Sequence, residues 1–320
     1  MKCRARAFTM QALVKYHGMR DWALRIPYHD SVSVNTDVAY VDAEVEFGDF
    51  DSDSVVTNGE VARGRSLERV ISVIDRVRSL AGIEERVRVV TENQPKVRAK
   101  GMGYSAAAGA SIAKAALHAA GLRELAEDPR FLSRVARLLA GSACRSAVGK
   151  FARWYAGTSD EDSYAEAFAD ERDMDLRFVI VPLHADIATE DAHREAETSP
   201  FFRERIRTAN ERCDRVVRAI KDGDFDALGR LVERDSLELH AITMTGDSGL
   251  IPVTPDSLRV ISVVKSLRAR GIPAYYSMQT GPTVYVNTLP EHVEEVELEL
   301  RGAGYFTLVS GVGGGATVIE

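Results

Sequence analysis

The chain has 320 residues, 45% of them hydrophobic and 28% charged, and a net charge of −7, as in an ordinary soluble globular protein. The basic residues are scattered rather than clustered with aromatic residues, so nucleic acid is not an expected partner. No apolar stretch approaches the roughly 18 residues of a membrane span, so no membrane association is expected.

The cysteines and the N-terminus indicate the compartment. Cys3, Cys144 and Cys213 are widely spaced and match no metal-ligand pattern, which favours reduced thiols in a cytoplasmic protein without a bound transition metal. The basic segment at residues 1–6 is followed by no apolar signal-peptide core, so export is not expected.

The first half is predicted to contain strands followed by helices. Apolar and polar residues alternate over residues 26–49, which predicts antiparallel strands with one solvated face. Asn58-Gly59 is a hairpin-turn signal. The other elements predicted here are strands at 3–16 and 86–92, and helices at 66–81, within 101–122, at 130–141 and at 142–155.

The second half is predicted to begin after an acidic stretch at 158–175. Its predicted elements are a strand at 176–183, helices at 199–221, 224–245 and 254–271, strands at 273–278 and 283–288, a helix at 290–302, and strands at 305–310 and 315–319. Because strands and helices are segregated, the predicted class is α+β. The length favours two domains, residues 1–175 and 176–320.

A glycine-rich segment, GMGYSAAAG at 101–109, stands between a predicted strand and a predicted helix. Small residues at a helix N-terminus let backbone N–H groups approach a phosphate, and the helix dipole adds partial positive charge. A close-packed helix start explains the pattern equally well, so the segment alone identifies no site.

Four segments become specific when they are considered together: VKYHGMRD at 14–21 followed by IPYHDSVS at 26–33, GSACRS at 141–146, TEDAHREAETSPFF at 189–202, and GPTVYV at 281–286. In the same order they resemble motifs of the mevalonate diphosphate decarboxylases, a family of the GHMP-kinase superfamily. The corresponding family motifs read IKYWGKRD…LPxNSSxS, GSACRS, a segment around TS, and DAGPNAxxF. The forms KYHGMRD, PYHDS and AHREA resemble archaeal phosphomevalonate decarboxylases and mevalonate 3,5-bisphosphate decarboxylases most.

The resemblance implies an N-terminal domain like ribosomal protein S5 domain 2 and a ferredoxin-like C-terminal domain, with the active site between them. It also implies a cytoplasmic homodimer that acts on a small phosphorylated mevalonate. The family reaction phosphorylates the tertiary hydroxyl of mevalonate from ATP and then expels that phosphate together with CO2.

The resemblance also assigns residues. Lys15 and Arg145 match the catalytic Lys and Arg of the family, and cations of this kind suit a leaving phosphate. Met19 stands where diphosphate-using members have a Lys, which favours a single 5-phosphate. Outside these motifs, Lys15 would be interpreted as a solvated lysine, and Arg145 as an ion-paired arginine. The implied substrate-binding residues are Tyr16, Met19, Ser142 and Arg194, although Arg194 equally fits a solvated helix start.

Two departures fall on the kinase half of the reaction. Gln279 replaces the family Asp, and an amide cannot accept the proton of a hydroxyl. Tyr104 replaces the first Ser of the phosphate loop, and residues 95–100 are about two longer than the family spacing. Gly101, Gly103, Tyr104 and Ser105 are therefore interpreted as a former nucleotide-phosphate loop.

These departures predict a mevalonate 3,5-bisphosphate decarboxylase that makes isopentenyl phosphate without ATP. Three alternatives remain open: a phosphomevalonate decarboxylase that uses Mg-ATP, a mevalonate 3-kinase, and a catalytically silent relative. Asp235, Ser236 and His240 favour a packed polar helix face over chemistry, and residues 311–315 favour a turn over a nucleotide loop.

Overall fold

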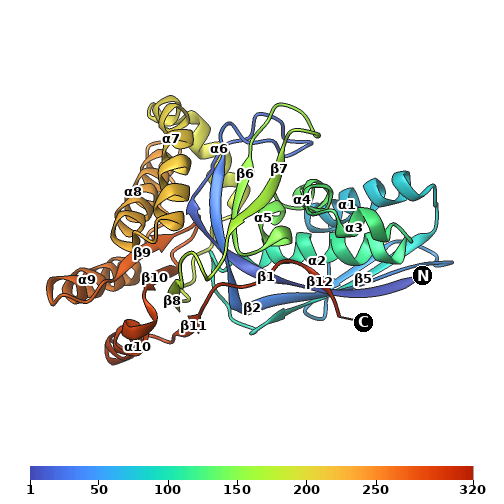
Figure 1. Cartoon of the computed structure of the whole chain (residues 1–320). Coiled ribbons are helices and arrows are strands. Elements are labelled where there is room, and N and C mark those ends of the chain that lie inside the picture. The colour runs from blue at the N-terminus through green and yellow to red at the C-terminus, as the bar shows by residue number, and fades with distance from the viewer. Residues whose placement is uncertain (320) are drawn as a thin grey trace.

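A computed structural model describes residues 1–319 and contains two β-sheets with helices packed around them (Figure 1). The larger sheet has the strand order β12-β1-β2-β5-β3-β4, and β2 also pairs with β6, which carries β7. Its strands are β1 (Lys2–Val14), β2 (Ser31–Gly48), β3 (Ser54–Thr57), β4 (Glu60–Val61), β5 (Arg86–Gln94), β6 (Phe151–Tyr155), β7 (Tyr164–Ala169) and β12 (Thr317–Val318).

The helices that pack on the larger sheet include one built almost entirely from small residues. Helix α2 (Tyr104–Ala119) is buried along most of its length and lies against β1 and β2. A Cβ added at Gly109 would lie 2.7 Å from the Cβ of Ala143, so a small residue here permits close approach of α5. The other helices on this side are α1 (Arg65–Ala81), α3 (Arg123–Glu127), α4 (Pro129–Arg137) and α5 (Ala143–Val148).

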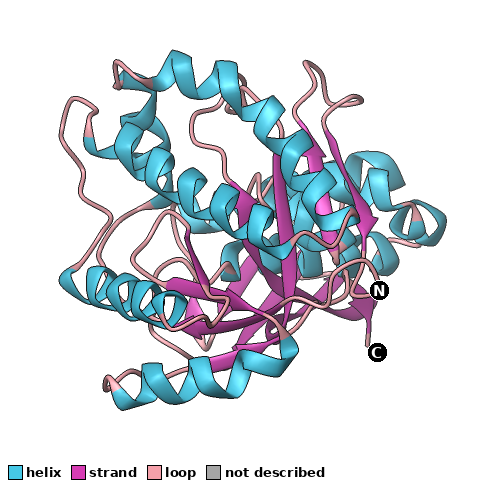
Figure 2. Cartoon of the chain, turned by 60° about the vertical axis from the view of Figure 1, so that its left-hand side comes forward, coloured by secondary structure: helices cyan, strands magenta, loops and turns pink. Residues whose placement is uncertain are grey.

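The smaller sheet has the order β11-β8-β10-β9, formed by Leu308–Ser310, Arg177–Val181, Val284–Thr288 and Tyr275–Met278. One face packs with α9 (Pro255–Ala269) and α10 (Val293–Gly302), the latter preceded by the 3-10 turn η1 (Pro290–His292). The other face packs with α7 (Phe202–Lys221), α8 (Phe225–Met244) and residues of β2. Figure 2 shows the strands of both sheets in the middle, with helices outside them.

The predicted α+β class with two domains is confirmed. The chain leaves the larger sheet after Ala169 and enters the smaller one at Arg177. Near its end it returns, because β12 pairs with β1 through Ala5 opposite Val318, which brings the two ends of the chain together (Figure 1). The division at residues 175 and 176 stays a prediction.

Several predicted elements are wrong, and the main one is the helix at 142–155. Helix α5 ends at Val148, because Gly149 and Lys150 adopt φ angles of 73° and 56° that reverse the chain. Residues 151–155 then form β6, and the acidic stretch predicted as a boundary contains β7. The predicted elements include no helix at α6 (Thr189–Thr198), because its composition is polar and its buried face carries Ala192, His193 and Ala196 rather than large apolar side chains.

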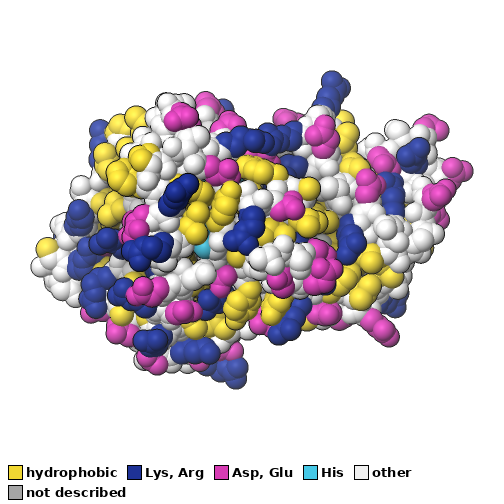
Figure 3. Space-filling model, turned by 90° about the horizontal axis from the view of Figure 1, so that it is seen from above, with side chains coloured by type: hydrophobic (Ala, Val, Ile, Leu, Met, Phe, Trp, Pro, Cys, Tyr) yellow, Lys and Arg dark blue, Asp and Glu magenta, His cyan; other side chains and the backbone are white. Residues whose placement is uncertain are grey.

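Two features of the described residues concern partners. Within residues 1–319, no helix has the length and apolar character needed to cross a bilayer. On the face drawn in Figure 3, Lys and Arg side chains are interspersed with Asp and Glu rather than gathered into one basic patch.

Candidate active site

A cavity of about 390 Å³ lies where segments attached to both sheets converge. The segment after β1 meets the starts of α2, α5 and α6 and the loop between β9 and β10. Ten of the predicted site residues line this cavity: Lys15, Tyr16, Met19, Gly101, Gly103, Tyr104, Ser105, Ser142, Arg145 and Gln279.

Lys15 follows directly after β1 and is almost completely buried. Its Nζ lies 3.5 Å from Oδ2 of Asp235, and the same carboxylate oxygen accepts the backbone N–H of Lys15 at 2.9 Å. Burial lowers the pKa of Lys15 to about 8, although Asp235 opposes that shift. Lys15 is therefore a cation at the wall of the cavity that is easier to deprotonate than an exposed lysine.

Asp235 is the centre of a buried ionic cluster on α8. Arg205 Nη1 lies 2.6 Å from Asp235 Oδ1, and Arg212 Nη1 lies 3.2 Å from the same oxygen. These cations and Lys15 hold the pKa of Asp235 at about 2, against the opposing effect of burial. Since Arg205 also donates to the carbonyl of Lys15 at 2.6 Å, the cluster fixes both the backbone and the charge of Lys15.

Arg145 is buried between two aromatic rings. Its Cζ lies 5.6 Å from the ring centre of Tyr16 and 5.9 Å from that of Trp154, a cation–π arrangement. No hydrogen-bond partner is found for its Nε or Nη1 among residues 1–319, and burial lowers its pKa. A buried guanidinium without a carboxylate partner beside a cavity is suited to an anionic ligand.

Glycine at position 141 is required by this packing. A Cβ there would lie 2.4 Å from the Tyr16 hydroxyl and 2.9 Å from the Trp154 ring. The GSACRS segment therefore starts with the residue that lets Tyr16 and Trp154 lie against Arg145.

The side-chain amide of Gln279 tethers the glycine-rich loop. Its Nε2 donates to the carbonyl of Gly101 at 2.9 Å and to that of Met10 at 3.0 Å. Its own backbone carbonyl is bonded to His240 Nε2 at 2.8 Å. The donor group of the amide is therefore used in positioning the loop against β1.

The loop forms a tight helix start. Gly103 has a φ of 84°, and a Cβ there would lie 3.0 Å from the carbonyl oxygen of Met10. The Tyr104 hydroxyl donates to the carbonyl of Pro95, so its ring is fixed toward the longer 95–100 segment. Ser105 is exposed, and both Ser105 and Lys100 line the cavity. The helix N-terminus, Ser105 and Lys100 suit a nucleotide phosphate. The ring of Tyr104 occupies part of the space at the same helix start.

The structure adds residues that sequence reasoning missed. Arg25, Arg65, Arg69 and Lys100 also line the cavity, and Glu190 is its only carboxylate among the described lining residues. Arg25 lies between two recognised motifs and Arg69 lies within a helix, so neither position carries a sequence signal. His17 and His193 line it too, with ring centres 4.8 Å apart.

Arg194 is the predicted site residue that the structure does not bring into the cavity. It is exposed, and its Cζ lies 4.4 Å from the Trp22 ring centre. It occupies the outer face of α6, whereas His193 points inward. The prediction that Arg194 binds substrate therefore gains no support from this arrangement.

The fold and the cavity between its two sheets define a two-domain α+β protein of the GHMP type. Residues 7–165 match the model of the diphosphomevalonate decarboxylase-like N-terminal domain, and residues 187–303 match the mevalonate 5-diphosphate decarboxylase C-terminal domain. The chain belongs to the mevalonate diphosphate decarboxylase family.

Among curated relatives, the phosphomevalonate decarboxylase of Haloferax volcanii is 42% identical over 322 residues, covering 100% of this chain and 98% of the relative. The mevalonate 3,5-bisphosphate decarboxylase of Thermoplasma acidophilum is 29% identical, over 88% of this chain and 69% of the relative.

Solved structures agree with the family assignment. The mevalonate diphosphate decarboxylase of Enterococcus faecalis, in a structure that concerns its ATP-binding mechanism, superposes with a TM-score of 0.92 at 29% identity and covers 100% of this chain and 99% of its own. A structure described as MDDEF with MVAPP, AMPPCP and magnesium matches with the same score, identity and coverage.

Proposed function

We propose that this protein decarboxylates a mevalonate that carries one phosphate at the 5-position and releases isopentenyl phosphate. One observation carries the proposal: the buried Lys15 lines the same cavity as Arg145, a buried guanidinium that has no carboxylate partner among residues 1–319. The full-length similarity to a phosphomevalonate decarboxylase supports the choice of substrate class.

The chemistry requires cations at the tertiary carbon of the substrate. When the bond between C3 and the phosphate oxygen breaks, its electron pair leaves with the phosphate. The bond to the carboxylate then supplies the electrons of the new C=C double bond, and CO2 departs. Arg145 and protonated Lys15 stabilise the charge that develops on the leaving phosphate, because fixed cations in a desolvated site act more strongly than in water.

The single 5-phosphate is supported by Met19. Its side chain is buried and packs with Tyr16 and Trp154, so an apolar thioether lies where a second phosphate would need a cation. Loss of one charge-assisted contact corresponds to roughly 1.5–3 kcal/mol.

The first candidate for the source of the 3-phosphate is Mg-ATP. It is favoured by the 42% identity to the phosphomevalonate decarboxylase and by the helix N-terminus beside Ser105 and Lys100. Mg-ATP bound there would supply the phosphoryl group. Phosphoryl transfer through a loose transition state depends chiefly on positioning and electrostatics, so Gln279 in place of a carboxylate is compatible with it. The sequence alone favoured the ATP-independent reaction over the ATP-dependent one. We now place the ATP-dependent reaction first.

The second candidate is ATP-independent elimination from mevalonate 3,5-bisphosphate. It is favoured by the amide of Gln279, which is bonded to Gly101 and Met10 and offers no proton acceptor in place of the family Asp. The ring of Tyr104 also takes up space at the same loop, which would hinder the binding of a nucleoside triphosphate there.

A four-arm incubation separates the candidates. Purified protein receives 5-phosphomevalonate or mevalonate 3,5-bisphosphate, each with and without Mg-ATP, while CO2 and inorganic phosphate are measured. CO2 from 5-phosphomevalonate only with Mg-ATP supports the first candidate. CO2 from the bisphosphate alone, with none from 5-phosphomevalonate in either arm, supports the second. Transfer of phosphate to the substrate without CO2 release would indicate a mevalonate 3-kinase, and no reaction in any arm would contradict the proposal.

Homodimeric assembly and a cytoplasmic location, which the resemblance implies, belong to the same proposal. Light scattering after size exclusion tests the first, and cell fractionation tests the second.

A further inference from the structure

Three arginines and one carboxylate lie at the cavity wall, and two of the arginines contact the carboxylate. Arg25 Nη2 lies 3.3 Å from Glu190 Oε1, and Arg65 forms an ion pair with Glu190 Oε2. Arg69 lies close enough to Arg25 for the two charges to repel, and burial followed by that repulsion lowers the pKa of Arg69 to about 10. All four side chains line the cavity.

Arg25 and Arg69 are held side by side from the end of α4. Arg25 Nε donates to the carbonyl of Leu138 at 2.8 Å, and Arg69 Nε donates to that of the next residue, Leu139, at 2.7 Å. Within residues 1–319 their Nη groups bond no residue other than Glu190. Two guanidinium groups are therefore fixed by their Nε atoms, and among the described residues Arg25 Nη1 and both Nη groups of Arg69 have no hydrogen-bond partner.

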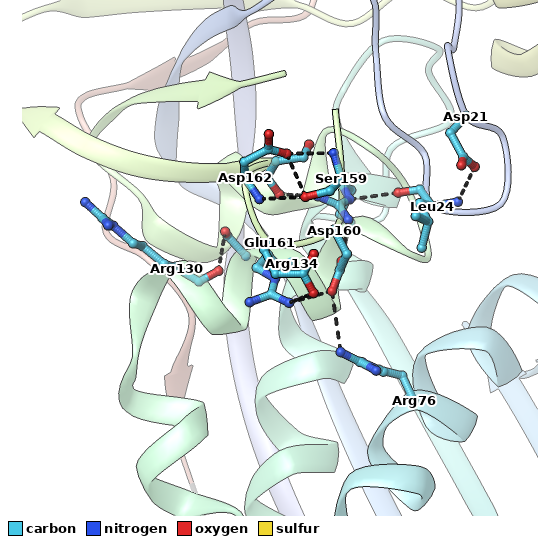
Figure 4. A network of polar contacts seen from close by, with 12 residues as sticks. Asp21, Leu24, Arg76, Arg130, Arg134, Ser159, Asp160, Glu161 and Asp162 are labelled. Carbon is cyan, nitrogen blue, oxygen red and sulfur yellow. Dashed lines mark hydrogen bonds and ion pairs between the residues drawn. The ribbon is translucent and has the colours of Figure 1, made fainter. Parts of the chain in front are cut away.

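The turn that carries Arg25 is fixed as well. The carbonyl of Leu24 accepts from Arg137 Nε at 2.8 Å, and the N–H of Leu24 donates to Asp21 Oδ1 at 2.8 Å. Arg137 is bound in turn to Asp160, which Arg134 and Arg76 also contact; Figure 4 shows the labelled side chains of this network beside Leu24. Arg25 is thus part of a rigid framework rather than a mobile surface side chain.

His193 adds a neutral donor on the same wall. Its Nδ1 accepts the N–H of Gly18 at 3.0 Å, and burial lowers the pKa of His193 to about 3. The neutral ring must then carry its proton on Nε2, for which the described residues offer no acceptor. Tyr16, whose ring centre lies 5.1 Å from that of His193, adds a hydroxyl.

The charges of this cluster match one ligand class. Three arginines and one carboxylate leave a net charge of about +2, and a phosphate monoester carries about −1.5 to −2 at pH 7. A diphosphate carries additional negative charge, which Glu190 would repel in a site of low effective dielectric.

We propose that Arg25, Arg65 and Arg69 bind the phosphate monoester of the substrate, and that Glu190 selects against a diphosphate. His193 Nε2 and the Tyr16 hydroxyl supply uncharged donors to the same group. The assignment of this phosphate to the 5-position rests on the proposed function, whereas the anion preference of the site does not.

Glu190→Gln tests the selectivity because it removes the charge and keeps the shape. Isothermal calorimetry with inorganic phosphate and with pyrophosphate gives the ratio of the two dissociation constants. In Glu190→Gln the binding of pyrophosphate should strengthen relative to that of phosphate by at least about tenfold, the size of one charge-assisted contact. The control Glu204→Gln removes the same charge from an exposed pair with Arg207 and should leave the ratio unchanged. An unchanged ratio in Glu190→Gln would overturn the proposal.

Steady-state kinetics show whether the arginine cluster binds the substrate phosphate or the nucleotide. Arg65→Gln alters a side chain that is 57% exposed, so the fold should be retained. It should raise KM for the 5-phosphorylated mevalonate at least about fivefold, with the KM for Mg-ATP unchanged in the ATP-dependent case. A rise in the KM for Mg-ATP alone would mean that the site holds the nucleotide, and it would overturn the assignment. If Glu190→Gln shifts the anion preference but the wild-type protein releases no CO2, the proposed function is wrong. The assignment of the arginine cluster as a phosphate-binding site is then still supported.

Discussion

Lys15 Nζ and Asp235 Oδ2 lie 3.5 Å apart although their residues are separated by 220 positions in the chain. The contact joins the end of β1 to the middle of α8, and so links the larger sheet to a helix that packs on the smaller one. Arg205 and Arg212 bind the same carboxylate from α7. The charge on Lys15, a residue of the first half, is therefore set by charged residues of the second half.

The pH dependence of kcat/KM follows from this contact. The pKa of Lys15 is lowered from its usual value to about 8, and the elimination needs its protonated form. Activity should therefore be lost as the pH rises through about 8. Asp235→Asn removes the anion that favours the charged lysine while Arg205 and Arg212 remain. The alkaline limb should then move to lower pH, and a limb that stays in place or moves upward would show that Lys15 does not cause it.

Asp235→Asn should also destabilise the fold. Removal of one partner from a buried ionic cluster leaves uncompensated charges and costs about 3–5 kcal/mol. Urea unfolding followed by circular dichroism measures the loss. Asp247→Asn, at an exposed position just after α8, is the matched control and should stay within about 0.5 kcal/mol of the wild type. A similar small effect for both variants would mean that the cluster does not stabilise the fold.

Arg145→Lys should lower kcat/KM by at least about 10²-fold, comparable to the loss of one preorganised donor at a developing oxyanion. A lysine keeps the charge but lacks the planar fork that lies between Tyr16 and Trp154. Arg172→Lys, which alters an exposed arginine paired with Asp170, is the control. Near-normal activity in Arg145→Ala, with circular dichroism unchanged, would mean that the active site lies elsewhere.

Gln279→Glu should disturb the glycine-rich loop rather than restore a base. Its carboxylate would face the carbonyl oxygens of Gly101 and Met10 in place of a donor, and this half-buried negative charge facing two acceptors would destabilise the loop. We expect a lower melting temperature in differential scanning calorimetry. If elimination operates alone, the shorter Gln279→Asp should create no ATP-dependent turnover, because Tyr104 still narrows the approach. A large gain in ATP-dependent CO2 release in Gln279→Asp would instead show that the nucleotide loop is functional and lacked only a base.

Met19→Lys tests the single-phosphate claim. In the wild type, the 5-diphosphate substrate should be used less efficiently than the monophosphate. A cation at position 19 should raise kcat/KM for the diphosphate about tenfold relative to the monophosphate, since one charge-assisted contact is restored. Equal kcat/KM values for both substrates in the wild-type protein would remove the basis of the claim.

Sequence patterns predicted several of the longer elements. The helices at 66–81, 224–245 and 254–271 and the strand at 86–92 match α1, α8, α9 and β5 closely. Ten residues predicted as site residues also lie at the cavity wall, at the ends of strands or the starts of helices. Local periodicity failed at β6 and β7, where two positive φ angles at Gly149 and Lys150 reverse the chain.

The long-range electrostatics could not be predicted from the sequence. Asp235 was interpreted as part of a packed helix face, and it is buried in one, yet its contact with Lys15 depends on how the two sheets pack. The cluster of Arg25, Arg65, Arg69 and Glu190 likewise joins a turn and two helices far apart in sequence. A local sequence pattern shows neither which charged residues will pair nor how many of them will line one cavity.

The most direct test of the central claim is a product balance with 5-phosphomevalonate and Mg-ATP, in which CO2 and isopentenyl phosphate are quantified by isotope release and mass spectrometry. We expect equal amounts of the two products from the wild-type protein and almost none from Arg145→Ala. A parallel sample with mevalonate 3,5-bisphosphate covers the ATP-independent route. Wild-type protein that releases no CO2 from either substrate, or an Arg145→Ala variant that releases as much as the wild type, would contradict the account.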